Sequence, residues 1–411
     1  MKPGFLNDFF EGVATKRLAP VEVNSMVSNQ HEFNVNSLVL DLFGRPAERQ
    51  NYSAQYFYFD DNESASCGGL LTLYDARKRD PKRSEYRMYF SRRTSEIMGR
   101  AESGDSLCLC KKRDGSVLVI VAKQFSNMES QLYYLFNLRP VSGRRFEGRI
   151  GFLDLGQKIE IVVREILSVL GIEYKEPGED EWLARMISEF GGAFPSTADF
   201  SEFARSTVAT DPIDAPDETL MLWYDRETVL FKILERHVIG ERLKRGFCDK
   251  GGVDIDGFIR YSLSVQNRRK SRAGHALENS ISELLSKNRI TFTRTPLTEN
   301  RNRPDFLFPS IEAYRDRGFP DAGLTMLGAK TSTKDRWRQV LEEADRIPHK
   351  HLITLEAPIS TNMTDQMRSR RLQLVVPKQM HSAFTQEQQA WLFTVSDFLE
   401  LVSERQKQYM K

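Results

Sequence analysis

Short apolar segments follow two different patterns along the 411 residues, and this change of pattern constrains the fold more than any other feature. Residues 1–172 carry short alternating or apolar segments separated by polar turns, which is typical of a β-rich barrel or sandwich. From residue 217 onward, helical periodicity alternates with apolar strands, which is typical of a mixed α/β sheet. The stretch between them is rich in Pro, Gly, Asp and Ser. The sequence therefore predicts two domains, over 1–172 and 191–411, joined by a linker over 173–190.

The expected elements follow this division. In the first part we expect a helix over 156–171 and strands over 37–42, 55–59, 69–74, 86–90, 116–122 and 131–136. In the second part we expect helices over 182–190, 218–245, 273–286 and 335–347 and strands over 305–308, 324–329, 351–355 and 372–376.

Charge is distributed unevenly, although the formal net charge is only +2. Basic residues concentrate at 77–93, 144–149 and 268–272. Such basic patches can bind a polyanion, although most runs of charged residues are only solvent-exposed surface. The four cysteines are too few for a disulfide framework, and no apolar run approaches the length of a membrane span. We therefore expect a cytosolic protein that does not bind membranes.

The residues best suited to chemistry are Asp305, at the start of one expected strand, and Lys330, at the end of the next. Hydrolysis of a phosphodiester at neutral pH needs a hard cation held by oxygen ligands, which Asp305 would supply. It also needs a positive charge near the attacking water, which Lys330 would supply. Taken alone, the pair is a weak signal, because such residues are often only a turn residue and a solvated lysine.

Two glutamates strengthen this signal. On the helix expected after Lys330, Glu343 lies on the flank of the apolar stripe, whereas Glu342 points outward. Glu343 is therefore a possible metal ligand beside Asp305. Glu278 similarly flanks the stripe of the helix expected over 273–286, and the simpler interpretation is a surface glutamate that pairs with a basic neighbour.

Two basic motifs surround these carboxylates. Arg268, Arg269, Lys270 and Arg272 lead into the Glu278 helix, where an N-terminal turn with cations would bind phosphates of DNA. The triplet 334–336 follows Lys330 closely and consists of Lys334, Asp335 and Arg336. Lysine and arginine donate to guanine and aspartate accepts from cytosine, so this triplet suits G·C pairs in the major groove. Without a catalytic neighbour it would more often be a salt-bridged helix start.

The motifs 267–278, 303–310, 329–331 and 334–339 together resemble the EcoRII type of restriction endonuclease. The resemblance implies a PD-(D/E)XK nuclease domain that acts as a Mg²⁺-dependent homodimer on double-stranded DNA, at a palindromic CC…GG site (CCWGG- or CCNGG-like). It places the catalytic set on Asp305, Lys330 and Glu343, with Glu278 as a further acidic member. An acidic residue usually precedes the lysine in the superfamily, and here Ala329 stands there. A protecting DNA methyltransferase is implied as a genetic partner.

The resemblance also covers two further sets of residues. Members of the family that flip the central bases hold them from the first helix of the nuclease domain, where this chain has Tyr224, with Arg226 in a shifted register. The central base pair, and flipping itself, therefore stay open. The N-terminal domain resembles, more faintly, an effector domain with a pseudobarrel like the plant B-three DNA-binding domains. By analogy His31, Arg83, Glu85 and Arg87 would contact a second copy of the site, and the domain would relieve a block on the nuclease.

The sequence also allows two functions from other classes of protein. A sequence-specific DNA-binding regulator with an inactive nuclease domain is the first, although intact Asp305, Lys330 and Glu343 argue against it. A repair or recombination nuclease that recognises DNA structures is the second, and the triplet 334–336 argues against it because such enzymes have less need to read bases.

Overall fold

The computed structural model describes residues 6–23, 31–61, 63–78, 84–91, 94–151, 166–167, 169–172, 178–249, 252–333 and 336–410. Contacts divide the chain into two compact units. Unit 1 comprises Met1–Tyr174 with the short segment Pro358–Asn362, and unit 2 comprises Lys175–Ala357 with Met363–Lys411. Each unit has a large β-sheet of its own, so the two patterns in the sequence correspond to two different folds.

Unit 1 is built on one eight-stranded sheet in the order β2-β5-β4-β3-β7-β6-β1-β8. Its strands are β1 (Phe10–Arg17), β2 (Glu32–Asn34), β3 (Gln50–Phe59), β4 (Ser64–Asp75), β5 (Tyr86–Phe90), β6 (Ser106–Lys112), β7 (Val117–Ala122) and β8 (Glu147–Ile150). Neighbouring strands are antiparallel except β3 and β7, which run parallel. The helices are α1 (Leu6–Phe9), α2 (Pro20–Val23), α3 (Ser37–Phe43), α4 (Ser95–Met98) and α5 (Asn127–Leu135).

The sheet of unit 1 curls so that strands near its two ends approach one another. β2 forms one edge and β1 lies next to the other edge, yet the Lys16 ammonium on β1 lies 5.7 Å from the centre of the Phe33 ring on β2. The same ammonium lies 4.9 Å from the centre of the Phe146 ring, just before β8. One hydrophobic core, which includes Phe33, Leu71, Leu109 and Phe146, fills the inside of the curl. The predicted β-rich pseudobarrel is therefore confirmed.

Two of the strands expected in unit 1 are helices instead. Residues 37–42 lie in α3, and residues 131–136 lie mostly in α5. Asn36 and Ser126 start these helices, because each side chain accepts a hydrogen bond from the backbone N–H three residues later, at 3.3 and 3.2 Å. The short apolar runs fit either type of element, and the capping residues decide the outcome. Most of the helix expected over 156–171 lies outside the described residues.

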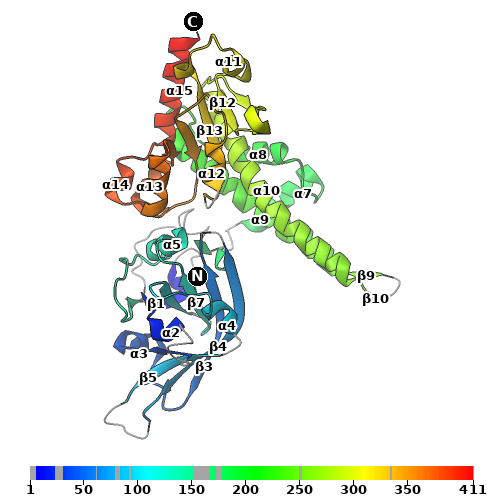
Figure 1. The fold of residues 1–411 in the computed structure, drawn as a ribbon. Coiled ribbons are helices and arrows are strands. Elements are labelled where there is room, and N and C mark those ends of the chain that lie inside the picture. Colours follow the sequence, from blue (N-terminus) through cyan, green and yellow to red (C-terminus); the bar gives the residue numbers. More distant parts are fainter. Residues whose placement is uncertain are drawn as a thin grey trace. The chain divides into compact units, whose positions relative to one another are not determined.

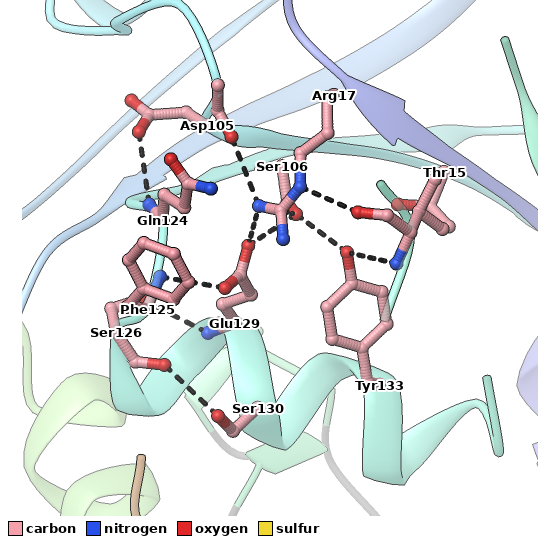
Figure 2. Close-up of polar contacts among 12 residues, drawn as sticks. Thr15, Arg17, Asp105, Ser106, Gln124, Phe125, Ser126, Glu129, Ser130 and Tyr133 are labelled. Carbon is pink, nitrogen blue, oxygen red and sulfur yellow. Dashed lines mark hydrogen bonds and ion pairs between the residues drawn. The ribbon is translucent and has the colours of Figure 1, made fainter. Parts of the chain in front are cut away.

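A buried polar network connects β1 and β6 to α5 (Figure 2). The Arg17 guanidinium donates to the Val141 carbonyl oxygen at 2.7 Å, to the Ser106 hydroxyl at 3.0 Å and to the Glu129 carboxylate. Ser106 donates to Glu129 at 2.6 Å and lies 2.8 Å from the Tyr133 hydroxyl. A buried carboxylate needs such partners, because an unpaired charge is costly to remove from water. Arg17 therefore supports the fold of unit 1.

Unit 2 contains a five-stranded mixed sheet in the order β11-β12-β13-β14-β15. Its strands are β11 (Thr293–Arg294), β12 (Phe306–Phe308), β13 (Thr325–Ala329), β14 (Lys350–Ile353) and β15 (Leu372–Val375). The pairs among β11, β12 and β13 are antiparallel, and those among β13, β14 and β15 are parallel. The predicted mixed α/β sheet is therefore confirmed.

Unit 2 also contains several helices. They are α7 (Glu179–Phe190), α8 (Thr197–Ser206), α9 (Pro216–Lys244), α10 (Ile255–Lys287), α11 (Ile311–Arg315), α12 (Arg336–Leu341), α13 (Thr361–Ser369), α14 (Gln386–Gln389) and α15 (Val395–Tyr409). α9 and α10 lie side by side and carry the small hairpin of β9 (Cys248–Asp249) and β10 (Gly252–Val253) at their far end (Figure 1). No helix in the described ranges is long and apolar enough to cross a membrane.

Both faces of the sheet in unit 2 are covered. A Cβ atom at Gly328 of β13 would lie 2.8 Å from Val340, so glycine allows α12 to pack directly on the strand. On the other face, the Phe398 ring of α15 packs edge-on against Phe308 at 5.7 Å and against His351 at 5.2 Å. Every residue of β12, β13 and β14 is accordingly buried. The polar groups that can reach solvent therefore lie at the ends of these strands.

The helices α7, α8 and α9 form a second core in unit 2, which includes Met186, Phe200, Leu230 and Leu234. α7 covers most of the stretch that we expected as a linker over 173–190. That stretch is therefore in large part a packed helix of unit 2.

Candidate active site

Asp305 and Lys330 lie side by side at one edge of the sheet in unit 2. Asp305 immediately precedes β12 and Lys330 immediately follows β13, and because these strands are antiparallel the two residues meet. The Asp305 Oδ2 atom accepts hydrogen bonds from the Lys330 ammonium at 2.6 Å and from the Ala329 backbone N–H at 2.7 Å. Their side chains are 12% and 14% exposed, so the pair is largely shielded from water but still reachable.

Glu343 completes this group from the turn after α12. The helix expected over 335–347 ends at Leu341, and Ala344 adopts a left-handed backbone with φ of 52°. Glu343 nevertheless faces inward and is 8% exposed, whereas Glu342 is exposed, as the helical pattern predicted. Burial raises the pKa of Glu343 to about 7; the Lys330 ammonium opposes this rise and the Asp305 charge adds to it.

Asp305 and Glu343 fit a hard divalent cation. The Glu343 Oε2 atom is buried and has no hydrogen-bond partner among the described residues, which is costly unless a ligand supplies one. Carboxylate oxygens are the ligands that Mg²⁺ prefers, and it is commonly bound by one or two carboxylates together with phosphate and water oxygens. Within the described ranges, no group of three or more His, Cys, Asp or Glu side chains is placed to hold a metal ion. Two carboxylates therefore match a site that substrate oxygens complete.

Glu278 lies on α10, where it forms an ion pair with Arg294 at 3.0 Å. Arg294 also donates to Asn279 at 2.8 Å, and it lies opposite Phe306 in the pairing of β11 with β12. Through Arg294, Glu278 thus helps to stabilise the strand that follows Asp305. This placement agrees with the simpler interpretation of Glu278 as a partner of a basic neighbour.

The basic run 268–272 lies inside α10 and not at its N-terminal turn, because the helix already begins at Ile255. Its side chains therefore point in different directions. Arg269 is exposed and pairs with Glu235 at 2.8 Å, and Lys270 is exposed. The Arg268 guanidinium lies over the Phe194 ring, 4.6 Å from its centre.

Arg272 is only 5% exposed. Its guanidinium pairs with Glu227 at 2.9 Å and lies 4.1 Å from the centre of the Phe200 ring. Burial lowers the pKa of this guanidinium, and the Glu227 charge opposes the shift. Arg272 therefore belongs to the core between the helices, and it offers little surface to a phosphate.

The residues considered for the central base pair are also part of the helix packing. Tyr224 is 5% exposed on α9. The Arg226 guanidinium lies 3.8 Å from the centre of the Trp182 ring and donates to the Thr207 hydroxyl at 2.8 Å. Burial leaves Tyr224 little surface for a flipped base, and Arg226 is already engaged by Trp182 and Thr207. Of the predicted base readers, Lys334 and Asp335 lie outside the described residues, and Arg336 is the exposed first residue of α12.

Three of the residues predicted to bind DNA in unit 1 are described by the structure, and they lie on β5 or near it. The Arg87 guanidinium bonds to Glu32 at 2.9 Å and to Glu85 at 2.7 Å, so its charge is balanced by two carboxylates. The His31 ring packs edge-on against Phe90 at 5.4 Å. Arg83 lies outside the described residues. The structure therefore brings Glu85 and Arg87 together and places His31 at the neighbouring strand.

Three residues at the site were missed by the sequence reasoning. Asn302 donates to the Glu342 carbonyl oxygen at 2.6 Å, and Lys350 donates to the Leu341 carbonyl oxygen at 2.6 Å. Both hold the turn that carries Glu343. Glu356 accepts hydrogen bonds from the loop after Lys330. Glu356 directly follows the strand expected over 351–355, as Lys330 follows the strand before it, so the rule that selected Lys330 would also have selected Glu356.

Comparison with known proteins identifies the same region. The family described as EcoRII C terminal matches residues 231–399, which include Glu278, Asp305, Lys330 and Glu343. The type II restriction enzyme EcoRII of Escherichia coli is 39% identical over 211 residues, which are 50% of this chain and 50% of that enzyme. The chain therefore spans about half the length of the curated relative that it matches.

The similarity of this chain to solved structures is lower. Metal-depleted Ecl18kI in complex with uncleaved, modified DNA has a TM-score of 0.45 and 17% identity, over 57% of this chain and 87% of that one. A complex of the restriction endonuclease PspGI with substrate DNA has a TM-score of 0.40 and 14% identity, over 56% of this chain and 94% of that one. Because both TM-scores are below 0.5, the assignment rests on the sequence match. The C-terminal half of this chain is therefore similar to the EcoRII type of restriction endonuclease, whose C-terminal family it matches over residues 231–399.

Proposed function

We propose that this chain is a type II restriction endonuclease, which hydrolyses double-stranded DNA at a short palindromic CC…GG site of the CCWGG or CCNGG kind. The observation that carries the proposal is the contact of Lys330 with Asp305, with Glu343 buried beside them, in a region that matches the EcoRII C-terminal family. A lysine and two carboxylates are the groups that phosphodiester hydrolysis requires.

Asp305 and Glu343 would hold Mg²⁺, which when bound polarises the scissile phosphate and lowers the pKa of a bound water. Lys330 would orient the attacking water as an ammonium, or take its proton as a neutral amine, from a position fixed by its 2.6 Å contact with Asp305. In its protonated form the same group would compensate the charge that develops on the phosphate. Glu278 supports this edge through Arg294, which pairs with the strand that follows Asp305.

Recognition of the site would use the triplet 334–336. Lys334 and Arg336 suit guanine, and Asp335 suits cytosine, so together they would read the CC:GG pairs from the major groove. Arg269 and Lys270 are exposed on α10 and are the members of the basic run best placed to contact phosphates, with Arg268 near them. A palindromic site is matched by a homodimer in which each nuclease domain cuts one strand.

Unit 1 would bind a second copy of the site as an effector, through the surface around His31, Arg83, Glu85 and Arg87, and so relieve a block on the nuclease. A DNA methyltransferase that protects the host is the expected genetic partner, and both enzymes would act in the prokaryotic cytosol. A fragment that begins just before α7 should then cut one-site DNA at least as fast as the full chain. A folded fragment that cuts more slowly would refute the block.

The direct test of the activity is the variant Lys330→Ala. It should lose cleavage of plasmid DNA with Mg²⁺ by about a thousandfold or more, because both the orienting group and its charge disappear. Specific binding of DNA, measured by fluorescence anisotropy without divalent cations, should remain. Substantial residual cutting by this variant would contradict the role of Lys330. Absence of cutting by the wild-type chain, with specific binding intact, would favour a DNA-binding regulator instead.

A further inference from the structure

Asp305 and Glu343, the two carboxylates that fit a divalent cation, belong to different segments of unit 2. Asp305 ends a loop that starts with the turn Glu299–Arg301, and Glu343 lies in the turn after α12. Three non-glycine residues of these segments have left-handed backbone, with φ of 55° at Asn300, 63° at Arg301 and 52° at Ala344. This backbone is unfavourable for residues with a side chain, so other contacts must hold both segments in place.

A side chain of the first segment binds the second segment directly. The Asn302 side-chain N–H donates to the Glu342 carbonyl oxygen at 2.6 Å. Both ends of this bond are fixed. The Asn302 carbonyl oxygen accepts from the Thr298 N–H at 2.9 Å, and the Lys350 ammonium donates to the neighbouring Leu341 carbonyl oxygen at 2.6 Å. Carbonyl groups at the end of a helix have no partner within it, so Asn302 and Lys350 together complete the C-terminal end of α12.

Tyr314 of α11 joins the same two segments a second time. Its hydroxyl donates to the Glu299 carboxylate at 2.7 Å and accepts a hydrogen bond from the Arg346 N–H at 3.3 Å. Tyr314 is 3% exposed, and the Arg346 guanidinium donates to two backbone carbonyl oxygens of the segment after α11, at 3.0 and 2.9 Å. The Asn302 bridge and the Tyr314 bridge therefore fix the loop before Asp305 relative to the turn of Glu343.

We propose that Asn302 and Tyr314 are positioning residues for metal binding, which set the separation of the Asp305 and Glu343 carboxylates. This role rests on the proposed function, and neither residue would touch the cation itself. Mg²⁺ demands near-octahedral geometry with oxygen ligands at about 2.0–2.1 Å, so the two carboxylates must be held closely. Partners that hold metal ligands in place typically contribute about tenfold to a hundredfold to metal affinity. Loss of either bridge should therefore weaken metal binding.

The test measures binding of Mn²⁺, a paramagnetic substitute for Mg²⁺, by the electron paramagnetic resonance of the free ion. Full-length wild type, Asn302→Ala, Tyr314→Phe and the double variant are titrated near pH 8 with DNA that the wild type has already cut. This DNA supplies phosphate oxygens and is not cut again. Both substitutions exchange neutral side chains, so a change in affinity cannot come from a change of charge.

Each single variant should raise the Kd for Mn²⁺ about tenfold, and the double variant should raise it about a hundredfold. Cleavage of uncut DNA gives a second measurement. The single variants should need more Mg²⁺ than wild type, and at saturating Mg²⁺ their cleavage rates should recover to within a few-fold. A bound cation draws the two carboxylates back together, whereas general damage to the site would not be reversed in this way.

The matched control is Glu342→Gln, which changes the exposed side chain of the residue whose carbonyl oxygen Asn302 binds and leaves both bridges intact. Its Kd should stay within about twofold of wild type, because an exposed charge is largely screened. The melting temperature of each variant is measured, and all titrations are made well below it.

An unchanged Kd for Mn²⁺ in folded Asn302→Ala and Tyr314→Phe, or a loss of cleavage that saturating Mg²⁺ does not restore, would overturn the positioning role. A wild-type chain that cuts no DNA would refute the proposed function itself. A wild type that cuts, with variants that bind Mn²⁺ equally well, would refute only the role of the two bridges.

Discussion

Replacing Glu343 with glutamine should make the metal-free protein more stable, and increasingly so as the pH rises. Burial raises the pKa of Glu343 from its ordinary value of 4.5 to about 7. Between these two pH values the folded chain keeps a proton on Glu343, whereas the unfolded chain has released it. The free energy of unfolding of the wild type therefore falls as the pH rises from 4.5 to about 7, and it stays lowered at higher pH. Glutamine is neutral throughout, so the variant avoids this loss.

The size of the effect follows from the pKa. A rise from 4.5 to about 7 corresponds to about 3 kcal/mol, because each pKa unit is worth about 1.4 kcal/mol. Glu343 is 8% exposed, so solvent screening reduces this value little. Urea unfolding in EDTA should therefore show Glu343→Gln more stable than wild type by about 3 kcal/mol near pH 8 and nearly equal to it near pH 4.5.

The control for this prediction is Glu342→Gln, because Glu342 is the exposed neighbour and its variant should stay within about 0.5 kcal/mol of wild type at every pH. Added Mg²⁺ should stabilise the wild type more than Glu343→Gln, because a bound cation compensates the charge of Glu343. A variant that is no more stable than wild type near pH 8, or that gains the same amount near pH 4.5, would show that the pKa of Glu343 is not raised in the folded chain.

Two further predictions concern buried charges of unit 2. The Asp217 carboxylate is 6% exposed and accepts hydrogen bonds from the N–H groups of residues 378, 395 and 396 at 2.9, 2.8 and 3.0 Å. In urea denaturation, Asp217→Ala should therefore lower the free energy of unfolding by on the order of 4 kcal/mol. A loss below about 1 kcal/mol would contradict this prediction. Arg272→Ala leaves the Glu227 charge buried and should also lower the free energy of unfolding by about 4 kcal/mol. Lys270→Ala should leave stability unchanged and should lower the number of ions released on DNA binding, measured by salt titration, by about one. If instead Arg272→Ala kept its stability and released fewer ions on DNA binding, Arg272 would contact phosphate.

The sequence predicted the arrangement of Asp305 and Lys330 because strand order alone brings their ends together. It also predicted which of Glu342 and Glu343 faces inward, although the helix ends before both, because the turn after α12 continues the direction of the helical stripe. The second prediction depends only on the helical periodicity of the segment around Glu343.

The sequence did not predict where α10 begins. Asp254 caps this helix by accepting a bond from the Gly257 N–H at 2.8 Å, so the basic run lies in the middle of the helix and Arg272 points into the core. Which of several arginines on one helix is buried depends on Glu227 and Phe200, which come from other helices. Such partners are brought together by tertiary packing, and no pattern within the run itself indicates them. The hydrogen bonds between Thr333 and Glu356 depend in the same way on a contact between two loops.

The most direct measurement of the central claim is the sequence of every new end after unmethylated DNA of known sequence is incubated with this chain and Mg²⁺, with Asp305→Ala in parallel. We predict discrete ends at one CC…GG motif in the wild-type reaction and none in the variant. The central base pair of the site would be read from the same ends. Ends scattered without a motif, or an identical pattern in Asp305→Ala, would contradict the assignment of this site as a sequence-specific nuclease.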